Sequence, residues 1–198
     1  ITGSNGKTTT TLLIHHMLKN AGIDAGLAGN VGSSFARQVA EEDHPVYVIE
    51  LSSFQLDDMY EFRAEIAILM NITPDHLDRY DYRMQNYVDA KFRIIRNQTP
   101  DDWFIYYADD EVITRELARR RPAATCIPFS LGPVNGDGAG IIHDTIEINI
   151  HKNRFSMSIL DLALQGKHNA CNSMAAAISG MAVGIRNERI RESLTDFQ

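Results

Sequence analysis

The chain has 198 residues, of which 44% are hydrophobic and 23% charged, a composition that is ordinary for a globular domain with a buried core. Acidic residues outnumber basic residues 26 to 19, and this balance argues against a nucleic-acid-binding protein. No apolar run approaches the roughly 20 residues that span a bilayer, and we find no signal peptide. We therefore expect a cytoplasmic protein, a monomer, that binds neither nucleic acid nor membranes.

Helix-like and strand-like segments alternate along the first two thirds of the chain. Continuous apolar runs such as 46–49 and 66–70 are typical of strands that are buried on both faces. The expected helices cover residues 8–20, 33–42, 54–62, 84–97 and 111–120, and the expected strands cover 23–28, 46–49, 66–70, 103–107 and 125–129. This alternation predicts an α/β fold with a mostly parallel sheet flanked by helices on both faces.

The stretch SLGPVNGDGAG interrupts this pattern with glycines and a proline. After it, residues 139–150 and 154–159 read as antiparallel strands joined by a turn at 151–153. We expect a small antiparallel appendage near 139–160, which could form a separate sheet. From 169 to 184 an alanine-rich pattern predicts a helix.

The two cysteines, Cys126 and Cys171, lie far apart and show no metal-ligand spacing. We interpret both as small core residues rather than as a disulfide or zinc ligands. Free thiols are consistent with a reducing compartment.

The first residues, ITGSNGKTTTT, have the parts of a phosphate-binding loop. Glycines let backbone N–H groups converge on an anion, and the helix that follows adds its positive end. Lys7 supplies a mobile charge for phosphates and Thr8 a hydroxyl for magnesium. Only two residues separate Gly3 from Gly6 where the usual pattern has four, so a simple glycine turn is the alternative. The predicted ATP-binding residues here are Gly3, Ser4, Asn5, Gly6, Lys7, Thr8 and Thr9.

A phosphate loop ordinarily follows a buried strand, and here only Ile1 precedes the loop. The other end stops at Gln198, directly after a helix-like stretch. We therefore expect the chain to be one part of a longer protein.

Four further polar stretches lie near the ends of predicted elements. They are GNVG at 29–32, ELSSFQL at 50–56, NITPDHLDRY at 71–80 and GKHNACN at 166–172. In a parallel α/β sheet, ligands bind at the carboxyl ends of the strands. We therefore expect these stretches to gather beside the phosphate loop.

With these stretches the sequence resembles the Mur ligase family, the ATP-dependent enzymes that form amide bonds in peptidoglycan synthesis. The loop TGSNGKTTT, the strand end at Glu50, the segment DHLDRY and the segment GKHNACN carry the resemblance. It covers essentially all of residues 1–198 and implies the central ATP-binding domain, without the family's N-terminal UDP-binding and C-terminal amino-acid-binding domains. The stretch ELSSFQLD resembles the member that joins D-glutamate to UDP-N-acetylmuramoyl-L-alanine through an acyl phosphate.

The resemblance also implies ATP, two Mg²⁺ sites and a set of residue roles. The implied catalytic residues are Lys7, His76 and Lys91. The implied metal ligands are Thr8, Glu50, His76 and Lys91. The implied substrate contacts are Asn30 and Ser52, and the implied contacts beside the adenine are Asn169 and Asn172.

Several of these residues also have an interpretation of their own. Glu50 ends an apolar strand, where a charge is costly unless it is paired or metal-bound, and a carboxylate turned to solvent is the alternative. His76 follows 73–75, which read as the cap and first turn of a helix, and a helix start leaves a neutral ring able to bind metal. A structural histidine is the alternative. Asn169 and Asn172 could instead cap a helix.

A lysine stands on the apolar face of the predicted helix 84–97. Met84, Val88, Lys91 and Ile95 share one face. Burial disfavours the ammonium form, and a neutral amine can react with carbon dioxide to give an anionic carbamate. In the resembling family the lysine in this place is carbamylated. The alternatives are that Lys91 extends to solvent along its stem, or pairs with Asp89 or Asp75.

The resemblance thus implies an ATP-dependent carbon–nitrogen ligase, and we expect the chain alone to bind nucleotide weakly and to be inactive. Another Mur-type ligase or a folylpolyglutamate synthase is an alternative within the enzyme class. A nucleotide-binding switch is an alternative from another class. Such a switch would carry a guanine-specific motif, and we find no convincing one.

Overall fold

The computed structural model describes residues 1–198, with secondary structure arranged as an α/β fold. The strands are β1 (Ala25–Gly29), β2 (Val46–Glu50), β3 (Ile66–Leu69), β4 (Trp103–Tyr107), β5 (Thr125–Phe129), β6 (Gly138–Ile142), β7 (Thr145–Ile150) and β8 (Asn153–Ser158). The helices are α1 (Lys7–Asn20), α2 (Phe35–Glu41), α3 (Ser53–Asp57), α4 (Met84–Phe92), α5 (Glu111–Arg120), α6 (Lys167–Ala182) and α7 (Asn187–Asp196). Short 3₁₀ helices are η1 (Leu77–Tyr80), η2 (Arg93–Ile95) and η3 (Ile159–Asp161).

The strands form a two-stranded sheet, β1-β2, and a six-stranded sheet in the order β3-β4-β5-β6-β7-β8. The pairs from β1 to β2 and from β3 through β6 are parallel, and β6-β7 and β7-β8 are antiparallel. The expectation of a mostly parallel sheet with an antiparallel part is confirmed. A separate sheet is wrong, because the pairing of Phe129 with Ala139 joins the antiparallel strands to β5.

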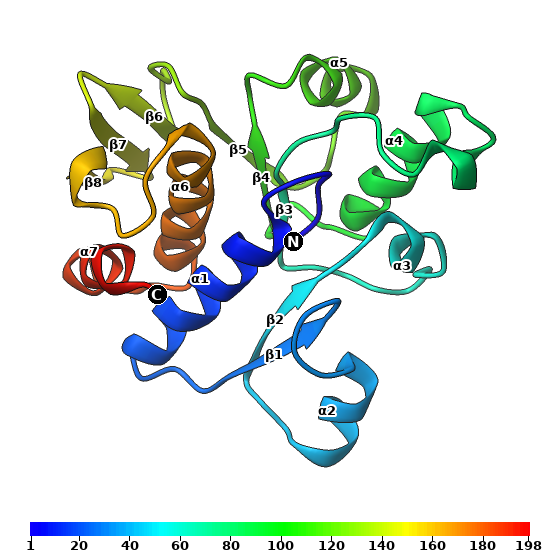
Figure 1. The fold of residues 1–198 in the computed structure, drawn as a ribbon, viewed down its shortest axis with the longest axis horizontal. Helices are drawn as coiled ribbons and strands as arrows, with labels where there is room; N and C mark the ends of the chain where they lie inside the picture. Colours follow the sequence, from blue (N-terminus) through cyan, green and yellow to red (C-terminus); the bar gives the residue numbers. More distant parts are fainter.

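Ile1 and Thr2 lie between the two sheets and connect them. The N-terminal nitrogen of Ile1 donates to the carbonyl of Ile49 at 2.7 Å, and the amide of Leu51 donates to the carbonyl of Ile1 at 2.8 Å. On the other side, Thr2 donates to the carbonyl of Ile68 and accepts from the amide of Met70. The phosphate loop therefore leaves from the middle of the combined sheet (Figure 1).

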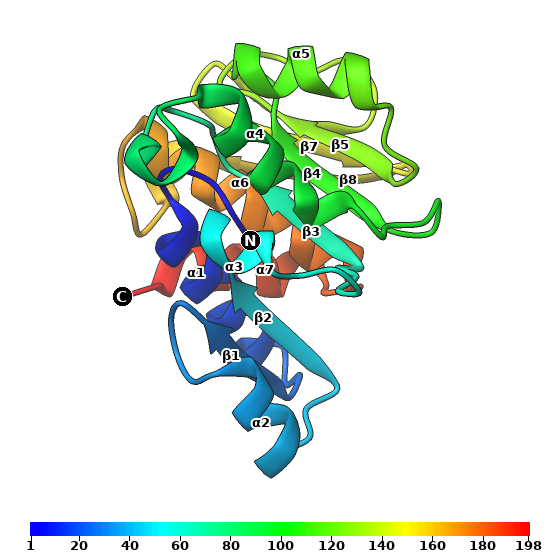
Figure 2. The same cartoon turned by 90° about the vertical axis from the view of Figure 1, so that its right-hand side faces the viewer.

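Helices cover both faces of the sheet, as the sequence predicts (Figures 1 and 2). Because side chains of a strand alternate between faces, β3 contributes to two cores. Ile68 packs in a core with α1, α6 and α7, whereas Ala67 and Leu69 pack in a core with α3, α4 and α5.

Some element boundaries differ from the expectation. The helix expected over 54–62 ends at Asp57, where the Arg93 side chain donates to the carbonyls of Leu56 and Met59. The helix expected over 84–97 ends at Phe92 and continues as η2. The single strand expected over 139–150 is a hairpin, because 143 and 144 turn the chain with positive φ angles.

The interpretation of the cysteines is half wrong. Cys171 is buried in the core, but Cys126 is exposed, and both thiols are free. Cys126 alternates along β5 with Ile127 and therefore points away from the core that Ile127 fills. No helix of the chain combines the length and the apolar character that crossing a membrane requires.

Candidate functional site

The phosphate loop lies at the carboxyl edge of the sheet, between β3 and the start of α1. Gly6 has φ 82°, in the left-handed region that glycine tolerates. A Cβ at Gly6 would lie 2.6 Å from Oδ1 of Asn172, and a Cβ at Gly3 would lie 2.9 Å from Cβ of Met70. Both glycines are therefore required by close neighbours as well as by the turn.

The segment 71–73 holds the loop in place. Asn71 and Asn5 exchange hydrogen bonds: the amide of Asn5 donates to Oδ1 of Asn71 at 2.8 Å, and Nδ2 of Asn71 donates to the carbonyl of Asn5 at 3.0 Å. The Ser4 hydroxyl donates to the carbonyl of Thr73 and accepts from its amide, each at 2.9 Å. Asn71 was not among the predicted site residues, although its place directly after a buried strand indicated this edge.

The start of α1 is open to an anion. No side chain caps the helix, so its first N–H groups have no side-chain partner. Nζ of Lys7 donates back to the carbonyls of Gly3 at 2.9 Å and Ser4 at 3.1 Å. Thr8 is exposed and Thr9 is partly exposed. The loop, Lys7 and Thr8 thus lie together, as the sequence predicts.

Lys91 reaches the same loop from the other face of the sheet. Its side chain is buried, with 1% exposed, and Nζ donates to the carbonyl of Gly3 at 2.8 Å. Burial lowers the pKa of Lys91 to about 7, with the charge of Lys7 adding to the decrease and Asp75 opposing it. The expectation of an inward-facing lysine is confirmed. The solvent-exposed alternative is wrong, and Asp89 pairs with Arg120 instead.

Tyr87 completes this part of the site and was missed by the sequence analysis. It lies one turn before Lys91 on α4, and its ring is 4.6 Å from Nζ of Lys91. Its hydroxyl shares a hydrogen bond of 2.9 Å with the Ser4 hydroxyl. Tyr87 therefore links the buried lysine to the phosphate loop. The i to i+4 spacing of Tyr87 and Lys91 was the available signal.

Glu50 is 1% exposed, so a carboxylate turned to solvent is wrong. Its Oε1 accepts from Nδ2 of Asn30 at 3.0 Å, and the amide of Asn30 donates to the carbonyl of Glu50. Oε2 is buried and has no hydrogen-bond partner. A buried carboxylate oxygen without a partner is costly, so this atom fits a cation or a donor from a ligand.

Ser52 and His76 lie on neighbouring loops. Ser52 caps α3 and forms a capping box with Gln55. The His76 ring is exposed and packs edge-on against Phe54, with 5.5 Å between ring centroids. The helix start expected at 73–75 is wrong, because Ser4 occupies the backbone groups of Thr73. His76 itself has φ 48°, and only η1 follows it.

Asn169 and Asn172 lie inside α6 rather than at its cap, which is Gly166, so the capping alternative is wrong. Nδ2 of Asn172 donates to Oδ1 of Asn169 at 3.1 Å. Oδ1 of Asn172 accepts from the Thr10 hydroxyl of α1 at 3.3 Å. These contacts bring the start of α6 against the phosphate loop.

The structure thus gathers the loop, the segment 71–73, Lys91 and Asn172 by direct contacts. No hydrogen bond or ion pair joins Glu50 or His76 to Lys7, Thr8 or Lys91. No group of three or more His, Cys, Asp or Glu side chains could hold a metal ion by itself. Mg²⁺ at this edge would therefore need oxygen atoms from nucleotide and water, which is its usual preference.

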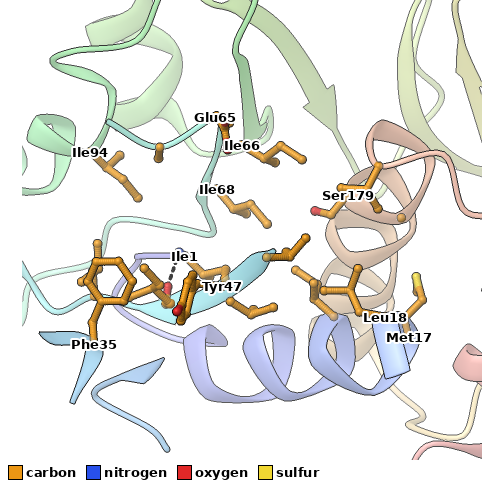
Figure 3. A pocket seen from close by; sticks show the side chains of 18 of the residues that line it. Ile1, Met17, Leu18, Phe35, Tyr47, Glu65, Ile66, Ile68, Ile94 and Ser179 are labelled. Atoms are coloured by element: carbon orange, nitrogen blue, oxygen red, sulfur yellow. Dashed lines mark hydrogen bonds between the residues drawn. The ribbon is translucent and has the colours of Figure 1, made fainter. Parts of the chain in front are cut away.

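A separate cavity of about 310 Å³ lies between α1, β2, β3 and α6 (Figure 3). Its lining is mostly apolar and includes Met17, Leu18, Tyr47, Ile66 and Ser179. The lining also includes Ile1 and Ile68, so the cavity lies between the two sheets.

Comparison with known proteins gives consistent results. The Mur ligase middle domain family matches residues 1–180. UDP-N-acetylmuramoylalanine--D-glutamate ligases of Bacteroides thetaiotaomicron and Porphyromonas gingivalis are 57% and 55% identical to the chain, over 100% of it and 44% of their own length. The chain therefore spans less than half the length of these curated relatives. A solved UDP-N-acetylmuramoyl-L-alanyl-D-glutamate--2,6-diaminopimelate ligase matches with TM-score 0.78 and 20% identity, over 99% of this chain and 45% of that one, which shows the shared fold.

Proposed function

The chain belongs to the Mur ligase family, as its middle domain, and we propose that it is the ATP-binding part of a ligase that joins D-glutamate to UDP-N-acetylmuramoyl-L-alanine. The carrying observation is the convergence of Lys7 and Lys91, from opposite faces of the sheet, on the carbonyl of Gly3. The identity of 57% to a relative with this activity in its name supports the choice of substrates. Domains outside residues 1–198 hold the UDP-sugar and bring in the amino acid.

ATP binds with its phosphates at the loop Gly3–Gly6. The free N–H groups at the start of α1 and the Lys7 ammonium neutralise the phosphate charge, which has to happen before a second anion can approach. The substrate carboxylate then attacks the γ-phosphate to give an acyl phosphate, and the amine of D-glutamate displaces phosphate. Asn169 and Asn172 lie beside the adenine.

The buried Oε2 of Glu50 has no hydrogen-bond partner, so it is available as a ligand for Mg²⁺. Thr8, Glu50, His76 and a carbamylated Lys91 would hold the two Mg²⁺ ions, with His76 at the second site. Bound Mg²⁺ supplies charge neutralisation between the phosphates and the carboxylate nucleophile. Asn30 donates to the other Glu50 oxygen, Oε1, so Oε2 is the oxygen that is left without a donor from the protein.

Lys91 would bind or orient Mg²⁺ as a carbamate. A pKa lowered to about 7 leaves a substantial fraction of neutral amine at physiological pH, and only the neutral amine reacts with carbon dioxide. The carbamate replaces a buried cation by an anion, which removes the repulsion from Lys7. Asn30 and Ser52 contact the UDP-sugar substrate from the ends of β1 and β2.

The full-length protein tests the proposal. Phosphate release is measured with ATP and UDP-N-acetylmuramoyl-L-alanine, adding D-glutamate, L-glutamate or diaminopimelate in separate reactions. D-Glutamate alone should support turnover, and the chain 1–198 by itself should release no phosphate. Turnover with another amino acid would assign a different Mur-type ligase. Binding of GTP without phosphate release in any reaction would support a nucleotide switch.

A further inference from the structure

The two sheets face each other across the cavity of about 310 Å³ (Figure 3). β2 is the end strand of one sheet, and β3 is the end strand of the other. Tyr47 and Ile49 of β2 line the cavity on one side, and Ile66 and Ile68 of β3 line it on the other. Folded proteins rarely leave two strand edges open beside each other, so these edges indicate a place for a further strand.

The first two residues already lie between these edges with the geometry of a parallel strand. The Ile1 nitrogen donates to the carbonyl of Ile49 at 2.7 Å. The Thr2 amide donates to the carbonyl of Ile68 at 2.9 Å, and Thr2 pairs with Leu69 in a parallel bridge. In a strand the N–H and the C=O of one residue point to the same side. The N–H groups of Ile49 and Ile68 therefore also point into the gap, and buried N–H groups need acceptors.

The cavity is lined by side chains from both hydrophobic cores. Met17 and Leu18 belong to the core that contains α1 and α6, whereas Leu51 and Ile94 belong to the core that contains α3 and α4. Figure 3 shows Met17 and Ile94 at opposite sides of the cavity. A strand points alternate side chains to opposite faces, whereas a helix turns one face to a groove. The lining therefore fits a strand that contributes side chains to both cores.

The nitrogen of Ile1 lies in buried surroundings at the end of this gap. Burial lowers the pKa of this amine to about 5, with the charge of Glu50 opposing the decrease. A peptide N–H at this position is neutral and can donate to the same carbonyl of Ile49 without the cost of burying a charge. These surroundings therefore suit a continuous backbone better than a charged amine.

We propose that the segment directly before Ile1 in the full-length protein is a β-strand that lies parallel between β2 and β3, fills the cavity and joins the two sheets into one. The curated relatives have the necessary length, because residues 1–198 match only 44% of theirs. The pairing of Ile1 and Thr2 determines the register of this strand. The residue directly before Ile1 lies opposite Ala67, and the second residue before Ile1 lies opposite Val48.

A strand explains the cavity better than a small apolar ligand does. Such a ligand could fill the same volume, but it would leave the N–H groups of Ile49 and Ile68 without acceptors. The carbonyls of a strand supply these acceptors, and the strand also removes both open edges. The strand is a property of the fold beyond the proposed function, and it is expected whichever substrates the protein uses.

Cysteine pairs in the full-length protein test the register. One variant carries Val48→Cys and a cysteine at the second residue before Ile1, which are the two positions expected to lie opposite each other. Neighbouring strands are about 4.8 Å apart, within the range of Cα distances that a disulfide spans. The matched control carries Val48→Cys and a cysteine at the residue directly before Ile1, whose side chain points to the other face. Mild oxidation should give an intramolecular disulfide in the first variant only, as measured by mass spectrometry of proteolytic peptides.

Thiol accessibility tests the burial of the strand separately. A single cysteine at the second residue before Ile1, without Val48→Cys, should react with a maleimide at least about 100-fold more slowly in the folded protein than in urea. Cys126 is exposed, and its labelling rate should differ far less between these two conditions. Labelling at equal rates in the folded protein and in urea would show that the segment lies outside the cavity, and this would overturn the inference.

The disulfide measurement also has outcomes that contradict the inference. Absence of the disulfide in the first variant, or an equal yield in the control variant, would overturn the expected strand. Disulfides between two molecules would place a second copy in the cavity instead. None of these measurements uses catalysis, so they remain informative if the full-length protein catalyses no ligation. That result would refute the proposed ligase and leave the strand to the cysteine measurements.

Discussion

Helices α1 and α4 each bring a lysine to the same carbonyl, from opposite faces of the sheet, but in different surroundings. Lys7 lies at the open start of α1 and is partly exposed, whereas Lys91 lies in the last turn of α4 and is 1% exposed. Both Nζ atoms donate to Gly3, at 2.9 Å and 2.8 Å. Two cations that share one acceptor repel each other, and the buried one loses its proton more easily.

The difference in solvent exposure between these two lysines therefore gives one residue type two chemical roles. A lysine at the rim stays available as a mobile charge for phosphate. Lys91, buried under the loop with a pKa of about 7, is neutral in a large fraction of molecules at pH 7. As a neutral amine it can be modified chemically. The following substitutions test this division.

The largest effect is expected from Lys91→Met. The side chain keeps its volume and loses the amine, so the carbamate cannot form. We expect kcat for ligation to fall on the order of 10³-fold, with a urea midpoint at pH 7 that is equal to or above that of the wild type. Phosphate release and urea unfolding measure the two effects. Activity within tenfold of the wild type would remove Lys91 from the mechanism.

Lys7→Met is expected to act mainly through ATP. Loss of the mobile charge should lower kcat/KM for ATP on the order of 10²-fold. The midpoint of urea unfolding should change little, because the side chain is partly exposed. Lys19→Met, at the far end of the same helix, is a matched control and should leave the kinetics unchanged. Equal values of kcat/KM for ATP in Lys7→Met and Lys19→Met would show that Lys7 has no specific role in ATP binding.

The pH dependence of stability separates the two lysines further. The pKa of Lys91 is about 7 in the folded protein and about 10.5 for a lysine in water, so the unfolded chain binds more protons between these values. The free energy of unfolding should therefore rise with pH across this window, by a few kcal/mol at most. Lys91→Met should remove this rise. The free energy of unfolding is measured by urea unfolding at several pH values, in buffers free of carbon dioxide. Because other groups titrate in the same range, the difference between wild type and variant is compared at each pH.

The smallest effect is expected from Gly6→Ala, which alters the α1 side of the loop without touching either lysine. A φ of 82° and a Cβ 2.6 Å from Oδ1 of Asn172 should together cost about 2 kcal/mol of folding stability. Gly22→Ala is the matched control, with φ 76° and no atom within 4 Å of the new Cβ. It should cost about 1 kcal/mol, from backbone strain alone. Equal losses in urea unfolding would show that Asn172 does not press on the loop.

Much of this arrangement could be predicted from local patterns. The spacing of Val88, Lys91 and Ile95 placed a lysine on an inward face, and its burial followed. The glycines and Lys7 indicated a phosphate loop before any fold was known. Such predictions succeed where a helical or strand period, or a short motif, carries the information.

The errors arose where a distant residue decides the local structure. The segment 73–75 has the composition of a helix start, but Ser4 takes the backbone groups of Thr73 that such a helix would need. Thr10 bonds to Asn172, far along the chain, and Tyr87 bonds to Ser4. No local pattern contains these pairs. The left-handed backbone conformation of His76 likewise appears only in the packed structure.

The reciprocal bonds between Asn5 and Asn71 have a consequence for nucleotide capture. Fixing the backbone of one residue costs about 1–2 kcal/mol of conformational entropy. Because Asn71 and Thr73 already anchor the loop, this cost is met during folding and need not be drawn from the free energy of association. Under the proposed function, the phosphates enter a loop whose backbone is already held by hydrogen bonds. In an Asn71→Ala variant the loop would have to become ordered when the nucleotide binds, and the affinity for the nucleotide would be lower.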